Sequence, residues 1–325
     1  MSQKTKDWAL FGLAVCLFLF VIVLKGHTIF TGVDRLPWKI LVPALAGFAL
    51  VHSVYMLGWR RAGVLFAIVT TVAFTFEFYG QSVGSLYGPY CYTPLLGPKV
   101  AGRIPVLIPF AWYMMVYPSY VIANLLAEGR ATSDPARPLR WIMLMAVLSA
   151  TILTAWDLTM DPIMSYEAAT EAAGAPLAVT TGDDMPAWRW TAEVTEPDQC
   201  HVAERLPNSE RTHFGVPWQN YLGWMITGFV VFLAFRLIER RLLLHRREID
   251  WKPQHMSRLV ALMPVTGYMA MAIVDAVLGS PRVQDVHMIS PFAMGLPAAL
   301  AIIAIFRPGF SLHHEETAEG DTTVG

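Results

Sequence analysis

The feature that most constrains this sequence is a series of apolar runs, each about as long as a helix that crosses a lipid bilayer. A hydrocarbon core of roughly 30 Å needs about 20 helical residues, and such runs recur along nearly the whole chain of 325 residues. The composition agrees, since 55% of the residues are hydrophobic and only 15% are charged. We therefore expect one polytopic membrane protein and not a string of soluble domains.

The predicted fold class is all-α, a transmembrane bundle of about eight helices (seven to nine) with one long extramembrane loop. The first run follows two lysines but has no small-x-small cleavage pattern after it, so we interpret it as a retained helix. Residues 1–310 should form a single transmembrane domain, and residues 311–325 a disordered acidic tail. The apolar pattern predicts helices at 8–24, 38–58, 62–80, 104–126, 139–160, 218–238, 258–278 and 287–306.

Positive charge is distributed unevenly over this topology. Lys and Arg concentrate on the side that carries both termini, which the positive-inside rule assigns to the cytoplasm. We therefore predict a multi-pass protein of the cell membrane with cytoplasmic N- and C-termini. The formal net charge of -1 gives no general attraction to nucleic acid. The residues that carry this bias are Lys4, Lys6, Arg60, Arg61, Arg130, Arg137, Arg140, Arg236, Arg240, Arg241, Arg246, Arg247 and Lys252.

Two connecting segments stand out. Residues 162–217 are too polar to be embedded, and Trp188 and Trp190 favour a lid that rests at the membrane interface; aromatic anchoring without substrate contact is the alternative. Residues 80–109 are rich in glycine and tyrosine, which suggests a re-entrant or tightly folded loop that could cap a pocket.

Common metal and nucleotide motifs are missing. The nine histidines have no HxxxH or HExxH spacing, so no metal site is predicted. Nucleotide-binding loops and a serine nucleophile elbow are also absent from the sequence. We interpret the three cysteines mainly as packing residues: Cys16, Cys91 and Cys200.

Four carboxylates fall inside or at the ends of the predicted helices: Glu77, Asp157, Asp161 and Asp275. An ionisable group in the membrane costs roughly 2.5–3.5 kcal/mol or more, so each is a functional hypothesis. Asp157 and Asp161 are four residues apart and share one helix face, where they could hold a proton, a water or a cation. The structural alternatives are that Asp161 sits at the interface before Pro162 and that Asp275 bonds to backbone near a helix end.

An ordered set of motifs extends over roughly residues 40–300. The motifs are Glu77-Phe78-Tyr79-Gly80, Tyr87-Gly88-Pro89-Tyr90-Cys91-Tyr92, Pro109-Phe110-Ala111-Trp112-Tyr113-Met114, Trp156-Asp157-Leu158-Thr159-Met160-Asp161-Pro162 and Phe214-Gly215-Val216-Pro217-Trp218-Gln219-Asn220-Tyr221-Leu222-Gly223-Trp224. This ordered set resembles the membrane-bound carotenoid 1,2-hydratase family. The chain departs from the family pattern at His213, where an aromatic is commoner, and in a longer stretch between Trp190 and Phe214. Both departures fall on the polar loop.

The resemblance implies an enzyme that adds water to the terminal C=C of an acyclic carotenoid end group and gives a tertiary alcohol. The implied substrate is of the lycopene, γ-carotene or bisanhydrobacterioruberin type, and no cofactor is required. An alkene is a poor base, so the step needs an acid kept protonated in an apolar site. Our hypothesis assigns the acid to one member of the Asp157/Asp161 pair. The other carboxylate and Glu77 would orient water and stabilise the cation.

An aromatic-lined slot could hold the long apolar ligand and shield the cation with the faces of its rings. Association with other carotenoid enzymes is a further expectation of the family. The candidate substrate-binding residues are Tyr87, Tyr90, Tyr92, Trp112, Trp156, Asn220 and Trp224.

Other functions compete with hydration. Asp157 and Asp161 also look like half of the aspartate pairs that hold Mg²⁺ and a diphosphate in intramembrane prenyltransferases, but a second such cluster is absent from the sequence. Membrane carboxylates also form proton relays in transporters, although no inverted repeat is evident here. A non-catalytic partner of another carotenoid enzyme is a third alternative.

Overall fold

The computed structural model describes residues 3–31, 38–134, 136–165, 186–200, 203–204, 206, 211–244, 257–278 and 286–312, and every structural statement below concerns these residues. The predicted acidic tail from residue 313 onward and nearly half of the polar loop lie outside them. Seven of the described helices are long and apolar enough to cross a membrane. The predicted helical membrane bundle is therefore confirmed, and the protein is a multi-pass membrane protein.

The helices agree with the predicted ones to within a few residues at most ends. The last span is one interrupted helix in which α8 passes through a π-helical turn, Pro291–Gly295, into α9. In α1 the apolar stretch, Trp8–Val23, is shorter than in the other spans. The helices are α1 Gln3–Thr31, α2 Trp38–Leu57, α3 Trp59–Val83, α4 Ile108–Glu128, α5 Leu139–Met164, α6 Trp218–Leu244, α7 Ser257–Leu278, α8 Val286–Ser290 and α9 Leu296–Phe306.

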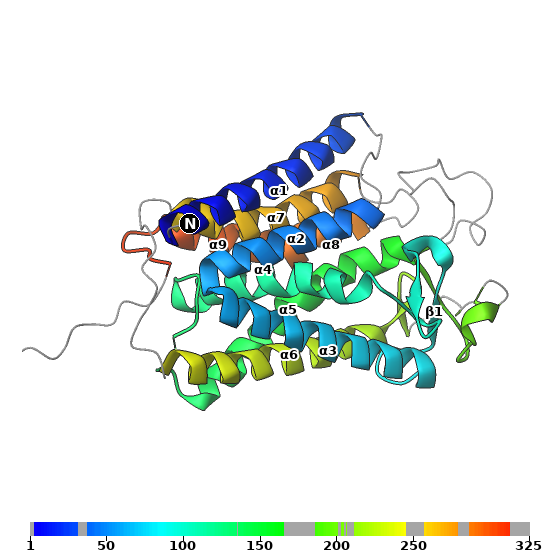
Figure 1. Ribbon diagram of the computed structural model, residues 1–325. Coiled ribbons are helices and arrows are strands. Elements are labelled where there is room, and N and C mark those ends of the chain that lie inside the picture. Colours follow the sequence, from blue (N-terminus) through cyan, green and yellow to red (C-terminus); the bar gives the residue numbers. More distant parts are fainter. Residues whose placement is uncertain are drawn as a thin grey trace, which may run out of the picture.

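Helix α4 forms the centre of the bundle. It packs against α2, α3, α5, α7 and α9, and its residues from Trp112 to Leu125 are buried. Figure 1 shows α1 on one side of the bundle and α3 with α6 on the opposite side. Side chains that project from α4, α5 and α6 toward one another are therefore removed from lipid.

Short strands gather at one end of the bundle, which we call the ribbon end; Figure 1 shows β1 there, far from the N-terminus. They build the predicted compact loop and explain why α4 begins at Ile108 and not at residue 104, since β3 occupies that position. Two 3-10 turns, Pro94–Leu96 and Pro197–Gln199, lie in the same loops. The antiparallel pairs are β1 (Tyr90–Tyr92) with β4 (Trp188–Trp190), β2 (Lys99–Val100) with β3 (Ile104–Pro105) and β5 (Thr212–His213) with β6 (Val216–Pro217).

Helix α5 continues through Pro162 to Met164, so Asp161 lies within the helix and not at its predicted end. Proline has no N–H and cannot bond the carbonyl four residues earlier, which is that of Leu158. His213 of β5 supplies the missing hydrogen bond, since its Nε2 lies 3.2 Å from the carbonyl oxygen of Leu158 and can donate to it. The departure from the family pattern at His213 thus satisfies a carbonyl located between the two aspartates of α5.

The cysteine prediction is wrong for two of the three residues. Cys91 of β1 and Cys200 form a disulfide across a sequence separation of 109 residues, whereas Cys16 is free and exposed. Packing was the expected role because neither spacing nor local sequence indicated that these two residues meet. Pairing of β1 with β4 is what brings the two chain segments together.

Candidate active site

The paired strands β1 and β4 present four aromatic side chains to the interior of the bundle. Their register sets Tyr90 opposite Trp190 and Tyr92 opposite Trp188. Side chains alternate between the two faces of a strand, so these four share one face while Cys91 lies on the other. The disulfide thus anchors the outer face of the ribbon, and the aromatic side chains of the inner face can contact α3 and α5.

Glu77 on α3 is buried and receives hydrogen bonds from three neutral side chains. The Tyr90 hydroxyl donates to its Oε2, the Tyr92 hydroxyl donates to the same oxygen at 3.0 Å, and Trp112 Nε1 donates to Oε1 at 3.0 Å. Burial raises the pKa of the Tyr90 and Tyr92 hydroxyls well above the ordinary value, with the nearby Glu77 adding to the effect. Both phenols therefore remain neutral donors at any physiological pH.

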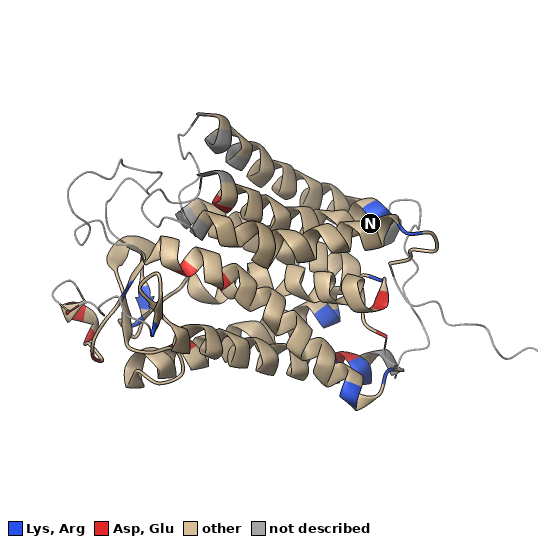
Figure 2. Ribbon diagram, turned by 180° about the vertical axis from the view of Figure 1, so that it is seen from behind, with Lys and Arg blue, Asp and Glu red and all other residues tan. Residues whose placement is uncertain are grey.

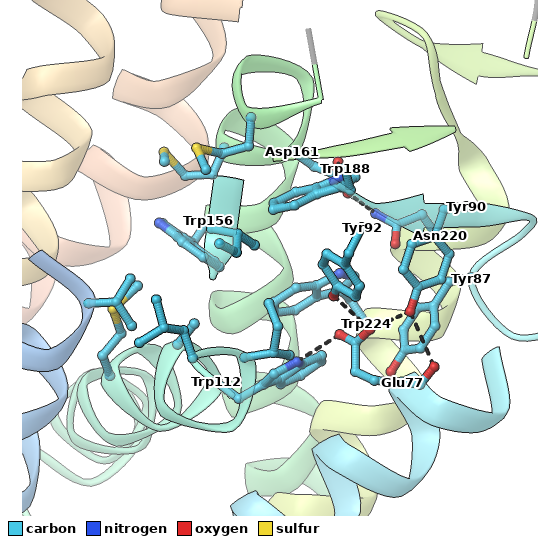
Figure 3. Close-up of a pocket in the computed structure, with 18 of the residues that line it drawn as sticks. Glu77, Tyr87, Tyr90, Tyr92, Trp112, Trp156, Asp161, Trp188, Asn220 and Trp224 are labelled. Carbon is cyan, nitrogen blue, oxygen red and sulfur yellow. Dashed lines mark hydrogen bonds between the residues drawn. The ribbon is translucent and has the colours of Figure 1, made fainter. Parts of the chain in front are cut away.

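Asp157 and Asp161 on α5 are joined by one amide. Asn220 Nδ2 donates to Asp157 Oδ2 at 2.8 Å and to Asp161 Oδ2 at 2.6 Å. The other oxygen of Asp161 accepts from Trp188 Nε1 at 2.7 Å and from Trp190 Nε1 at 3.2 Å. The i, i+4 spacing does place both aspartates on one face, and Asn220 from α6 holds them together. Figure 3 shows Asn220 beside Asp161.

Most of these groups line one cavity at the ribbon end, which encloses about 720 Å³ of empty space including its mouth. Trp112 and Trp224 stack in its wall with ring centroids 3.8 Å apart, and Figure 3 shows the acidic and aromatic side chains around one hollow. The remaining lining is aliphatic or thioether: Val42, Leu96, Leu107, Ile108, Ala111, Met114, Met160 and Met164.

The Tyr87 ring lies between α3 and α6, and each of these helices has a glycine where it contacts the ring. A Cβ on Gly80 of α3 or on Gly223 of α6 would lie 2.5 Å from a ring carbon of Tyr87. The Tyr87 hydroxyl bonds Thr227 Oγ1 at 2.7 Å. Both glycines are therefore required by close packing, and they let the tyrosine form the floor of the cavity between α3 and α6.

The structure brings most of the predicted site residues together. Glu77, Asp161 and all seven candidate substrate-binding residues line the cavity. Asp157 is not among the lining residues and reaches it through Asn220. Asp275 lies elsewhere, on α7, where it accepts a hydrogen bond from Thr159 Oγ1 at 3.2 Å.

Trp188 and Trp190 were predicted to lie over the membrane interface, yet their indoles donate directly to Asp161. The sequence carries a signal for this arrangement. Tyr-Cys-Tyr and Trp-Arg-Trp both place aromatic residues two apart, the spacing of one strand face. The pairing of two segments almost 100 residues apart could not be read from that signal.

The chain is similar to proteins of carotenoid biosynthesis. The family described as "Carotenoid biosynthesis protein" matches residues 38–171 and 176–283, which is more than half of the chain. This chain belongs to that family. It is also 29% identical over 201 residues to the bisanhydrobacterioruberin hydratase of Haloarcula japonica.

That alignment covers 62% of this chain and 54% of the relative, so the chain spans about half the length of the relative it matches. No solved structure matches the chain. The family's matched region includes every residue that lines the cavity.

Proposed function

We propose that the protein is a hydratase that adds water to the terminal C=C of an acyclic carotenoid end group. The observation that supports this most is a set of buried carboxylates around one aromatic and aliphatic cavity. Their hydrogen-bond donors among the described residues are phenol, indole and amide groups, which are all neutral. Such a cavity suits a polyene, and the acids supply what an apolar alkene lacks, namely a proton donor.

The proposed reaction begins with protonation of the alkene by the Asp157/Asp161 pair. Two carboxylates held by a single amide repel each other if both are ionised, so the pair favours keeping one proton. Asp161 lines the cavity and is the member that meets the ligand, whereas Asp157 acts through Asn220. The π electrons form the new C–H bond, and the more substituted carbon becomes a tertiary cation.

Glu77 is proposed to stabilise that cation. Its three donors, Tyr90, Tyr92 and Trp112, are neutral, so they hold the carboxylate in place without cancelling a negative charge on it. The stacked Trp112 and Trp224 rings add the negative faces of their π systems. A water oxygen then attacks the cation, and its released proton returns to the aspartate pair, so the acid is regenerated.

The lining of the cavity does not favour a prenyltransferase. Within the described part of the chain, the cavity wall includes no Lys or Arg that would hold a diphosphate. Phosphate recognition depends on such groups or on metal ions. Mg²⁺-dependent consumption of a prenyl diphosphate by the purified protein would contradict the proposed hydration.

The direct test is expression beside a lycopene pathway, followed by mass analysis of the extracted pigments. The unaltered chain should give products heavier by one or two waters. Asp157→Asn and Asp161→Asn should each lower product formation by about 10²–10⁴-fold, the usual contribution of a positioned acid. Undiminished hydroxylated product from both variants would remove the pair from the mechanism.

The disulfide also bears on orientation. Cys91–Cys200 lies at the ribbon end, and structural disulfides persist in oxidising compartments. Figure 2 shows Lys and Arg near the N-terminus at the other end of the bundle, as well as in the loops of the ribbon end. We therefore propose that the ribbon end lies outside the cell and the termini in the cytoplasm. A thiol reagent that cannot cross membranes should label a Glu193→Cys variant in intact cells, because residue 193 is exposed in the loops of the ribbon end. Lack of labelling would reverse the orientation.

A further inference from the structure

The cavity at the ribbon end is shallower than an acyclic carotenoid is long. On α5 its lining extends from Trp156 to Met164 at the helix end, and these eight positions at 1.5 Å each give a depth of about 12 Å. An acyclic carotenoid is a stiff conjugated chain whose length approaches the thickness of the bilayer core, roughly 30 Å. The cavity can therefore enclose one end of such a ligand, and the rest of the chain has to leave it.

Four partly exposed lining residues mark the place where the cavity reaches the surface. Leu107 and Ala111 lie at the start of α4, Met164 is the last residue of α5 and Trp188 is the first residue of β4. Helices α4 and α5 pack against each other in opposite directions, so the start of α4 lies beside the end of α5. The Ala187 N–H donates to the Met164 carbonyl at 2.8 Å, which holds β4 at the same place. We call this opening the α4–α5 mouth.

The surface around the α4–α5 mouth is apolar. None of its four rim residues carries a charge, and their neighbours Val106 and Phe110 on the same stretch of α4 are 45% and 37% exposed. Exposed apolar side chains that gather at the end of a membrane-spanning helix suit contact with lipid or with an apolar ligand. A hydrocarbon chain that leaves the cavity here therefore stays in apolar surroundings.

The opposite wall of the cavity is closed by stacked rings. Trp224 is also partly exposed, but its ring lies on that of Trp112 with centroids 3.8 Å apart. Figure 3 shows these two rings beside Glu77, across the hollow from Trp188. A ligand whose reacting end lies near Glu77 thus has its open path on the side of Trp188 and the α4–α5 mouth.

We propose that the long chain of the ligand passes from the cavity into the bilayer through the α4–α5 mouth, and that Ala111 is a specificity-determining residue because its small side chain leaves room for that chain. The inference rests on the proposed function and deepens it. The substrate class is an isoprenoid longer than the cavity, bound by one end only, while the remainder of its chain lies among lipids.

The test narrows the mouth and compares a long ligand with a short one. Lycopene is the long ligand, and an acyclic isoprenoid alkene of two isoprene units, with the same end group, is the short one that fits inside the cavity. Dissociation constants are measured on the purified full chain in detergent, by absorbance change for lycopene and by titration calorimetry for the short alkene. Ala111→Trp should weaken lycopene binding at least about tenfold and change binding of the short alkene less than about twofold.

Ala67→Trp is the matched control, because Ala67 is exposed on α3 and does not line the cavity; both affinities should remain as in the unaltered chain. Met164→Trp repeats the test from the α5 side of the mouth and decides the matter if Ala111→Trp does not fold. Unchanged lycopene affinity in the folded variant would overturn the proposal. Equal weakening of both ligands would also overturn it, because the damage would then lie in the site of the end group.

Product analysis on the same samples separates this proposal from the proposed function. Water added to lycopene by both the unaltered chain and Ala111→Trp, with equal affinities, would leave the hydratase function standing and remove the role of the mouth. Loss of binding for the long ligand alone, with no water added by the unaltered chain, would support the mouth and contradict hydration. A short alkene that the unaltered chain does not bind would contradict enclosure of one end.

Discussion

The two ends of the bundle both bury acidic side chains, but they satisfy them in different ways. At the ribbon end, the hydrogen bonds that reach Glu77, Asp157 and Asp161 come from phenol, indole and amide donors. At the opposite end, which we call the arginine end, Glu239 on α6 accepts from the Tyr120 hydroxyl at 2.9 Å and pairs with Arg61 at 3.5 Å.

The arginine end also contains a buried cation. The Arg236 guanidinium lies 4.7 Å from the centroid of the Tyr120 ring. It donates hydrogen bonds of 2.7 to 3.0 Å to the side-chain oxygens of Asn124, Ser133 and Ser149. An opposite charge nearby lowers the free-energy cost of burying a carboxylate and neutralises it. A carboxylic acid held only by neutral donors has no such compensation, so its proton and its charge stay available for chemistry. The difference fits our proposal that the ribbon end supplies chemistry, while the arginine end holds helices together.

The largest effect should separate the two kinds of acid. Glu77→Gln removes the charge proposed to stabilise the cation and should lower hydration by about 10²–10³-fold, with little change in thermal unfolding. Glu239→Gln is the matched control at the arginine end, and its hydration rate per folded protein should remain near that of the unaltered chain. Both rates are measured by product mass analysis. Equal losses in the two variants would remove the functional contrast between the ends.

The next effect concerns stability at the arginine end. Arg236→Met should destabilise the protein by about 3 kcal/mol, because it removes the donor to the buried side-chain oxygens of Asn124, Ser133 and Ser149. Thermal unfolding in detergent measures this loss. A variant as stable as the unaltered chain would mean that the buried guanidinium does not hold α4, α5 and α6 together.

A smaller effect should come from the packing of Tyr87 at the ribbon end. Gly223→Ala would place a Cβ 2.6 Å from the backbone oxygen of Leu86 as well as against the Tyr87 ring. The forced shift should cost about 1–3 kcal/mol and displace the tyrosine from the cavity. Gly63→Ala on α3 is the control, since nothing lies within 4 Å of its added Cβ. Matching unfolding temperatures for the two variants would contradict the close-packing argument.

The smallest effect is a pH dependence that comes from His213. Burial lowers the pKa of this imidazole below its ordinary value of 6.5, although its bond to Leu158 opposes the shift. Below pH 6.5 the unfolded chain therefore takes up a proton that the folded chain resists, so stability is fully present above that pH and falls as pH drops. His213→Phe should flatten this part of the stability profile between pH 7 and 5. An unchanged slope would mean that His213 makes no contribution.

Much of the cavity could be predicted because its chemistry is local in sequence. Asp157 and Asp161 are four residues apart on an apolar helix, and that spacing alone places them on one face. Their bridging by Asn220 could not be predicted, since it depends on how α6 packs against α5. The contact of Trp188 and Trp190 with Asp161 could not be predicted for a similar reason. A three-residue strand is identified by its partner strand more than by its own sequence.

The sequence by itself determined the class of the protein, since only helices with satisfied backbone groups allow such apolar runs to cross a bilayer. It also determined which polar residues would be costly there, and hence where to look for function. The tertiary structure decided how those residues are satisfied: by a ribbon whose disulfide joins Cys91 to Cys200, by an amide from α6 and by a histidine that replaces the bond Pro162 cannot make. These contacts link residues distant in sequence, so only the folded chain brings them together.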